Sequence, residues 1–324
     1  MTEPAGKLDV LLATGRVTVE HDNEFRSFRH HTSMLTTLLE STGRFRVRVL
    51  EEFRGIGDEL LERFDVVLVM YEGRDDYHSV AEGFGTTTEQ ALLRFVRDQG
   101  KGIVWFHGSS VQEPDWGWPE EFDRMRGATL SRETGLRPRP QGEVVVRTAE
   151  PRHPITEGLD AEWAVVNDDV LTGARMDPSA QVLLTVFDDA DSYRRAGWPN
   201  AHTPVVIPPG GLEALNGMNT DQPLAWVNEW GAGRSFCVTL GHDWDTFRKI
   251  PFMTILVRGV EWTATGEVTL GAPQRTGAAR WRVWPYYAGD PSRFDRAVAA
   301  LADAVDVTDT PPPPAPLILD RVAD

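Results

Sequence analysis

Two histidines each follow directly on a predicted β-strand. The apolar run 102–106 leads into His107, and the run 234–240 leads through Gly241 into His242. In a parallel sheet the carboxyl ends of the strands meet at one edge, where ligands bind. We therefore expect both imidazoles at a single small-molecule site, although either histidine taken alone fits a loop-capping role equally well.

Two kinds of chemistry are open to this pair. A carboxylate would complete a three-ligand site for a divalent metal, Zn or Mn, with a position left for substrate. Without a metal, the imidazoles would act as general acid and base, because the pKa of histidine, about 6.5, lies near physiological pH. No short-range signature such as His-Glu-x-x-His occurs. The candidate carboxylates are Asp168, Asp169, Asp243 and Asp245.

Acyl transfer through a covalent intermediate is not expected. The single cysteine, Cys237, lies inside a predicted strand, and the position after the strand 102–106, where a nucleophile would stand, holds His107. Ser109 and Ser110 lie nearby but outside any Gly-x-Ser-x-Gly elbow. A glutamine amidotransferase activity is therefore excluded.

The elements that must position the histidines alternate along the chain. Strand patterns at 8–13, 45–50, 66–70 and 102–106 are separated by helix patterns that end at Gly43 and Gly100. A capping box at Thr86-Thr87-Thr88-Glu89 is expected to begin the second helix. Such alternation predicts an α/β fold with a doubly wound, mostly parallel sheet and helices on both faces.

The rest of the chain is less regular. Prolines break the middle third into short strands, including 143–147 and 181–187, before strands at 224–230 and 234–240 and a helix at 251–264. Residues 1–266 are expected to form one domain. Residues 267–324, with prolines at 311–314, are expected to be a C-terminal extension that is partly packed or disordered.

Composition narrows the class of protein. The 324 residues, 41% of them hydrophobic, can bury a core without disulfides, and the single cysteine suits the cytoplasm. No apolar run approaches the roughly 20 residues of a membrane span. A net charge of -16 without a basic stripe argues against a nucleic-acid partner.

Five segments, in order, carry a resemblance to a known family. They are Phe28-Arg29-His30-His31, the segment 100–107, the tryptophan-rich 115–119, the segment 153–159 and the segment 233–242. Together they resemble the ThuA-like (trehalose utilisation) proteins over about residues 8–266. That family has the flavodoxin-like fold of the class I glutamine amidotransferases without the catalytic cysteine, so the resemblance implies the same fold here.

The resemblance also implies site residues. His30, His107 and His242 fall where the family gathers its pocket histidines, and Asp168-Asp169 fall where it carries Asp-Glu. We expect catalytic roles for His107, His242 and Asp169, with the two histidines as metal ligands if a metal is bound. The expected substrate-binding residues are His30, Trp105, Trp116, Trp118, Asp168 and Trp244, the indoles stacking on sugar rings.

Other positions are expected to be structural or differ from the family. His31 is expected to be solvated, and His153 to hold a turn. Val170-Leu171 replaces the usual aromatic pair, and Gln222 stands where the family often has histidine. These two differences count against a metal site that uses those positions.

The implied function is carbohydrate processing. The expected substrate is a disaccharide, a glycoside or its 3-keto derivative, with a sugar dehydrogenase as functional partner. The reaction would then be that of a keto-sugar isomerase, a lyase or a glycoside hydrolase. The alternative is a non-catalytic sugar-binding or complex-forming subunit. The sequence leaves the oligomeric state open, and a homodimer is compatible with it.

Overall fold

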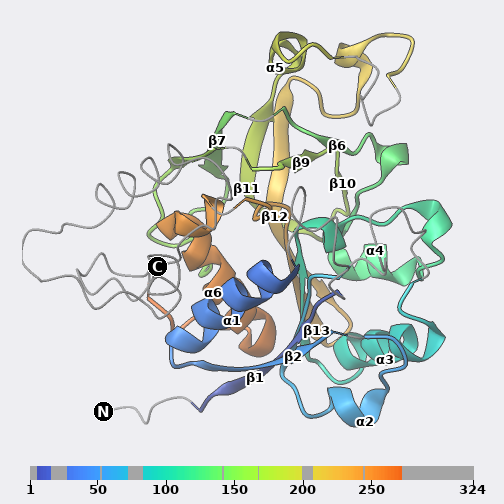
Figure 1. The fold of residues 1–324 in the computed structure, drawn as a ribbon, viewed down its shortest axis with the longest axis vertical. Coiled ribbons are helices and arrows are strands. Elements are labelled where there is room, and N and C mark those ends of the chain that lie inside the picture. The colour runs from blue at the N-terminus through green and yellow to red at the C-terminus, as the bar shows by residue number, and fades with distance from the viewer. Residues whose placement is uncertain are drawn as a thin grey trace, which may run out of the picture.

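A computed structural model of the 324-residue chain describes residues 6–15, 28–51, 53–71, 83–140, 142–166, 168–198, 207–243 and 245–271, without the side chains of residues 28 and 29. Its centre is a nine-stranded sheet (Figure 1). The strand order is β2 (Phe45–Leu50), β1 (Leu8–Ala13), β3 (Val66–Val69), β4 (Gly102–Phe106), β13 (Gly233–Val238), β12 (Thr220–Trp230), β11 (Gln181–Asp188), β7 (Glu143–Thr148) and β8 (Glu162–Val166).

The sheet has a parallel part and an antiparallel part. From β2 to β13 all neighbours are parallel, in the strand order of flavodoxin-like folds. From β13 to β8 all neighbours are antiparallel. The expected α/β fold with parallel strands and helices on both faces is thus confirmed. Strands β7, β8 and β11, from the proline-broken middle third, form the antiparallel part together with β12.

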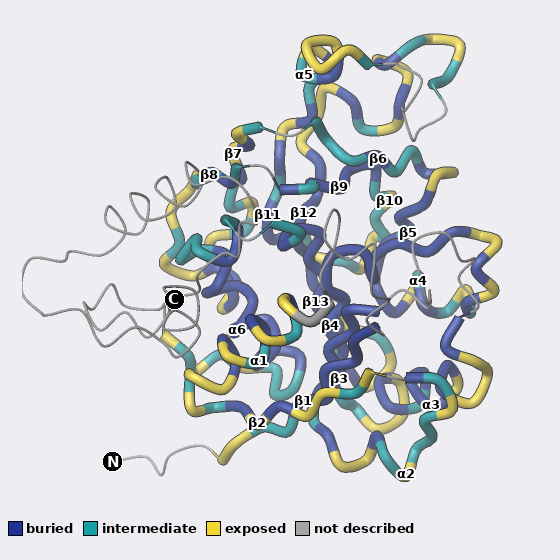
Figure 2. Tube along the Cα trace, in the orientation of Figure 1, coloured by how far each residue is buried: buried dark blue, intermediate teal, exposed yellow. Residues whose placement is uncertain are grey.

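Helices cover both faces of the sheet (Figure 1). One face carries α1 (Phe28–Ser41) and α6 (Ile250–Thr265), and the other carries α2 (Asp58–Leu61), α3 (Thr86–Arg97) and α4 (Glu121–Arg126). Each face has its own hydrophobic core (Figure 2). Helix α6 is buried along nearly its whole length, including Arg258 and Glu261, so its apolar residues are not confined to one face.

Smaller elements extend the antiparallel end. Helix α5 (Ala190–Arg195) packs with a third, small core beyond the ends of β11 and β12. Two short ladders pair β5 (Ala128–Thr129) with β10 (Arg175–Met176) and β6 (Arg137–Pro138) with β9 (Leu171–Thr172). No helix among the described residues has the length and apolar character needed to cross a membrane.

The start of α3 differs in part from the expected capping box. The N-cap is Gly85, and no side chain caps the helix there. Glu89 does reach back, accepting the amide of Phe84 at 3.0 Å. The hydroxyl of Thr88 instead accepts the amide of Ile56 and donates to the carbonyl of Phe53. The threonine part of the prediction was wrong because Thr86, Thr87 and Thr88 all lie inside the helix, which has Gly85 as its N-cap.

Only the first residues of the C-terminal extension are described, and they are packed. Val268 and Leu270 lie against the core of the α1–α6 face. The carboxylate of Glu261 accepts the amides of Thr269 and Leu270. The remainder of the extension lies outside the described residues, so its expected state stays a prediction.

Candidate functional site

The two histidines lie side by side at the carboxyl ends of β4 and β13. These strands are parallel neighbours with Trp105 opposite Cys237, so the residues after them meet. Nδ1 of His107 donates to the carbonyl of Thr239 at 2.7 Å, so in the neutral ring Nε2 is the nitrogen that accepts. Nδ1 of His242 is 3.2 Å from that Nε2. The structure thus brings together the pair expected from the sequence.

His107 occupies a strained turn. Its φ of +49° is uncommon for a residue with a Cβ and costs about 1–3 kcal/mol. A sharp turn directly after a central strand is the position of the nucleophile in α/β-hydrolases. Here that position presents an imidazole. Ser109 donates its hydroxyl to the carbonyls of Val69 and Phe106, and burial raises the pKa of Cys237, so neither is an activated nucleophile.

Asp169 completes the group, which we call the His–His–Asp centre. One ligand atom from each of His107, Asp169 and His242 lies within 4.8 Å of the others, and Oδ2 of Asp169 is 4.0 Å from Nδ1 of His242. Two ligands of a tetrahedral zinc ion stand about 3.4 Å apart. The donor set fits Zn or Mn, and the bond from His107 to a carbonyl is the usual outer-shell support of a metal-bound imidazole.

Asp168 holds the loop that carries His242. Its side chain is 1% exposed, and its carboxylate accepts the amides of Gly241 at 2.9 Å and Asp243 at 2.8 Å. Burial raises the pKa of Asp168, while these hydrogen bonds lower it. These contacts hold the loop in place, and the expected contact of Asp168 with substrate stays a prediction.

His31 holds the same loop from the other side. It is buried, and its Nε2 lies 3.1 Å from the carbonyl of Gly241 and 3.0 Å from that of His242. The expectation that His31 is solvated was wrong. The available signal was helical spacing, because His31 shares a face of α1 with Leu35 and Leu38, which are buried. His30, the expected pocket residue, is exposed.

The backbone of residues 241–243 is therefore held from two directions, an arrangement we call the loop clamp. Asp168 binds its amides and His31 its carbonyls. Asp243, the last residue of this loop, is partly buried, and burial raises its pKa to about 6. Trp244 lies outside the described residues, so its expected contact with substrate stays a prediction.

The other expected sugar-binding tryptophans lie in the core of the α3–α4 face. Trp105 is fully buried, and Trp116 and Trp118 are 5% and 6% exposed. The ring centre of Trp105 is 5.5 Å from that of Phe122, and Trp116 and Trp118 lie edge to face. Their ring surfaces thus pack against other protein side chains, which differs from the stacking on sugar that we expected.

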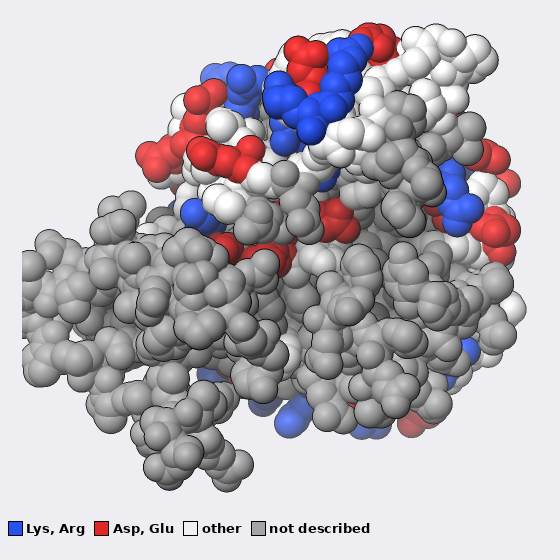
Figure 3. All heavy atoms as spheres, turned by 45° about the horizontal axis from the view of Figure 1, so that its top comes forward, with Lys and Arg blue, Asp and Glu red and all other residues white. Residues whose placement is uncertain are grey.

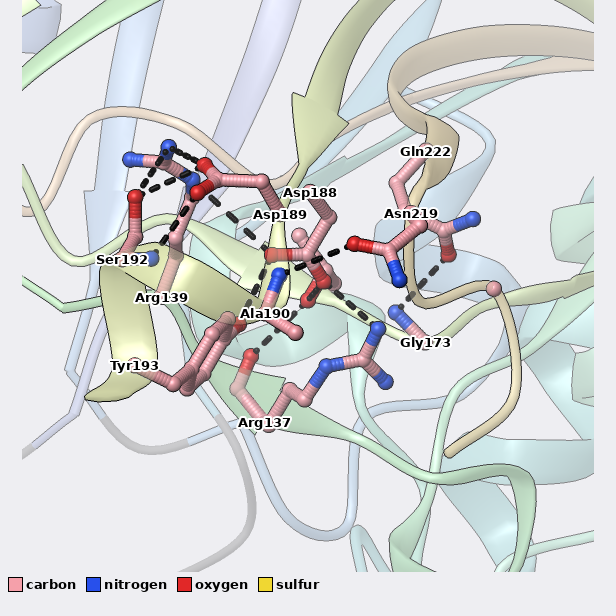
Figure 4. A network of polar contacts seen from close by, with 12 residues as sticks. Arg137, Arg139, Gly173, Asp188, Asp189, Ala190, Ser192, Tyr193, Asn219 and Gln222 are labelled. Carbon is pink, nitrogen blue, oxygen red and sulfur yellow. Dashed lines mark hydrogen bonds and ion pairs between the residues drawn. The ribbon is translucent and has the colours of Figure 1, made fainter. Parts of the chain in front are cut away.

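A second buried polar cluster lies at the antiparallel end of the sheet (Figure 4). The carboxylate of Asp188 pairs with Arg137 at 2.5 Å and accepts the hydroxyls of Thr172 and Tyr193. These contacts come from β6, β9 and α5, so the cluster joins those elements to β11. Gln222, which stands in place of the family's histidine, accepts the amide of Gly173 nearby and is not part of the His–His–Asp centre.

Acidic and basic side chains alternate on the surface around α5 (Figure 3). Arg194 pairs with both Asp191 and Glu213, which neutralises its charge locally. This part of the surface therefore offers no basic field of the kind that binds nucleic acid.

Comparison with known proteins shows the family and the fold. The family model described as ThuA, Trehalose utilisation, matches residues 10–263. Two crystal structures of ThuA-like proteins share the fold. The one from Parabacteroides merdae has a TM-score of 0.61 and 21% identity, covering 83% of this chain and 94% of that one. The one from Bacteroides uniformis has a TM-score of 0.56 and 14% identity, covering 83% and 97%.

A search of curated proteins gives no sequence match. The family match alone spans more than half of the 324 residues, and the two similar structures show the same architecture. The chain belongs to the ThuA (trehalose utilisation) family.

Proposed function

We propose that this protein is a carbohydrate-processing enzyme whose reactive group is the His–His–Asp centre. The observation that carries the proposal is the meeting of His107, Asp169 and His242, three residues from distant parts of the sequence, at the carboxyl edge of the parallel strands. Structural needs alone do not explain two imidazole nitrogens 3.2 Å apart beside a carboxylate. The family's description as trehalose utilisation favours a disaccharide or a related glycoside as substrate.

The proposed substrate is the 3-keto derivative of such a sugar. A ketone at C3 acidifies the hydrogen on C2, which an imidazole can remove as a general base. The electron pair then forms the enolate and expels the glycosidic oxygen from C1. That oxygen takes a proton from a second acidic group, so the products are an unsaturated keto sugar and the free alcohol. Isomerisation would return the proton instead.

The residues of the centre have distinct parts in this scheme. Because Nδ1 of His107 donates to the carbonyl of Thr239, its Nε2 is the nitrogen that can accept a proton. His242, whose Nδ1 faces that nitrogen, can donate the returning proton. Asp169 lies beside His242 and stabilises its charged form.

The same three residues would hold a divalent metal ion. Zn or Mn bound there would polarise a substrate oxygen as a Lewis acid, and both imidazole lone pairs would then be engaged. Activity with and without a chelator distinguishes the metal-dependent enzyme from one that uses the imidazoles as base and acid.

The experiment is incubation of the protein with oxidised and unoxidised disaccharides, followed by NMR. We expect new species from a 3-keto substrate, and loss of turnover in the His107→Ala and His242→Ala variants. His153→Gln is the matched control, since His153 accepts the amide of Ile155 in a turn and should not affect turnover. Uptake of a disaccharide without any product would instead support the binding subunit, and activity in both alanine variants would refute the centre.

The setting of the reaction follows from its substrate. A sugar dehydrogenase must supply the 3-keto group, so we place the enzyme in the cytoplasm beside such a partner. Co-incubation of the two enzymes with an unoxidised disaccharide should yield the same products as the keto sugar alone.

A further inference from the structure

A fully buried arginine lies on the α3–α4 face of the sheet, outside the His–His–Asp centre. Arg126 is in the last turn of α4. Its guanidinium carbon is 4.8 Å from the ring centre of Trp105 and 5.8 Å from that of Trp118. The two indole rings are themselves 6.3 Å apart. We call these three side chains the Arg126 cluster.

One nitrogen of the guanidinium is paired within the chain. Nη2 of Arg126 donates to Oε1 of Gln112 and, at 2.6 Å, to Oδ1 of Asp123. The side chain of Asp123 is 25% exposed whereas that of Arg126 is fully buried. Water therefore screens the acid more than the base, and two guanidinium nitrogens still need acceptors.

Four donor nitrogens of the cluster have no hydrogen-bond partner among the described residues. They are Nε and Nη1 of Arg126, Nε1 of Trp105 and Nε1 of Trp118. A buried donor left unpaired costs about 1–3 kcal/mol, and buried polar groups are almost always paired. Four such donors on three adjacent side chains indicate that an acceptor belongs between them.

The chemistry of the cluster favours an anion over water. A buried water accepts hydrogen bonds but also needs acceptors for its own two hydrogens. The unpartnered side-chain atoms of the cluster are all donors. A halide ion accepts from several donors and donates to none. We propose that a small inorganic anion of the halide class binds in the Arg126 cluster, between the guanidinium and the two indole N–H groups.

One buried carboxyl group lies near the cluster. A Cβ built on Gly83 would be 2.6 Å from Oε1 of Glu89 and 3.5 Å from Nε1 of Trp118, so Glu89 is near this indole. Its Oε1 accepts the amide of Phe84, so this carboxyl group already has a partner at the start of α3.

The anion would stabilise the strand that presents His107. Trp105 lies in β4, two residues before His107. A ligand that binds only the folded protein increases the free energy of unfolding as the ligand concentration rises. The proposal does not depend on the catalytic function, because none of the cluster's donors belongs to the His–His–Asp centre.

The test compares thermal unfolding in potassium chloride, potassium bromide and potassium gluconate at equal ionic strength. We expect the midpoint to rise saturably with chloride and bromide but not with gluconate. Trp118→Phe keeps the ring and removes one donor, so halide affinity should fall about tenfold. Trp262→Phe, a buried tryptophan on α6, is the matched control and should keep the halide dependence of the wild type.

A second measurement locates the ion. Crystals grown in bromide should show an anomalous peak between Arg126 and the two indoles, and Arg126→Met should lose the halide dependence. Equal midpoints in chloride and gluconate for the wild type would overturn the proposal, as would an unchanged dependence in Trp118→Phe or the absence of the anomalous peak at this site.

Discussion

Replacing His31 with leucine should weaken metal binding at a distance from the metal ligands. The change removes the Nε2 donor that lies 3.1 Å and 3.0 Å from the carbonyls of Gly241 and His242. An intramolecular hydrogen bond contributes about 0.5–1.5 kcal/mol net, so losing this shared one should cost about that much loop stability. Carried fully into metal binding, this loss lowers zinc affinity about 2–13-fold.

The assay is calorimetric titration of the metal-free protein with Zn²⁺. His31→Gln keeps a donor near the same place and should recover part of the affinity. His30→Leu changes the exposed neighbour on α1 and should behave as wild type. Unchanged zinc affinity in His31→Leu, or an equal loss in His30→Leu, would show that the loop clamp does not set the geometry of His242.

Burial raises the pKa of Asp243 to about 6, which is above its value in the unfolded chain. The free energy of unfolding therefore falls as the pH rises through about 4–6, because the unfolded chain releases this proton before the folded chain does. Asp243→Asn, unfolded in chelator, should therefore gain stability over wild type at pH 7 and none below pH 4; a constant difference would contradict this sign. Asp188→Asn leaves a buried arginine without its charge partner and should cost about 3–5 kcal/mol in denaturant unfolding, with zinc affinity unchanged. Gly241→Ala would place a Cβ 2.6 Å from a phenylalanine ring at a φ of +105° and should cost about 2 kcal/mol or more; a wild-type unfolding midpoint would refute the close contact.

The parallel part of the fold was predictable from the sequence because its signals are local. The apolar runs at 8–13, 66–70 and 102–106 correspond to buried central strands. Their ends place His107 at the sheet edge, and the same reasoning placed His242. The antiparallel part was not predictable, since its pairing depends on contacts between short segments that are far apart in the sequence.

The choice of carboxylate could not be made from the sequence. Four aspartates near the two histidines were equivalent candidates, and only the folding of residue 168 under the 241–243 loop separates their roles. That contact turns Asp168 inward to the backbone and leaves Asp169 beside His242. The role of His31 likewise depends on this loop, whose carbonyls it contacts. The helical pattern of α1 gave no sign of that partner.

The tryptophans show a further limit of sequence reasoning. Aromatic residues near a predicted site fit both a sugar-binding surface and a hydrophobic core. Burial decides between them, and Trp105 at 0% exposure packs in the core. A strand-end position alone therefore did not identify which side chains reach the substrate.

The three donor residues of the His–His–Asp centre should bind one metal ion together, and metal binding by the purified chain tests this directly. Calorimetric titration with Zn²⁺ and Mn²⁺ should show one ion bound per chain, and His107→Ala, Asp169→Ala and His242→Ala should each abolish or strongly weaken that binding. Binding that persists with wild-type affinity in all three variants, or a wild-type protein that takes up neither ion, would contradict the assignment of the metal centre.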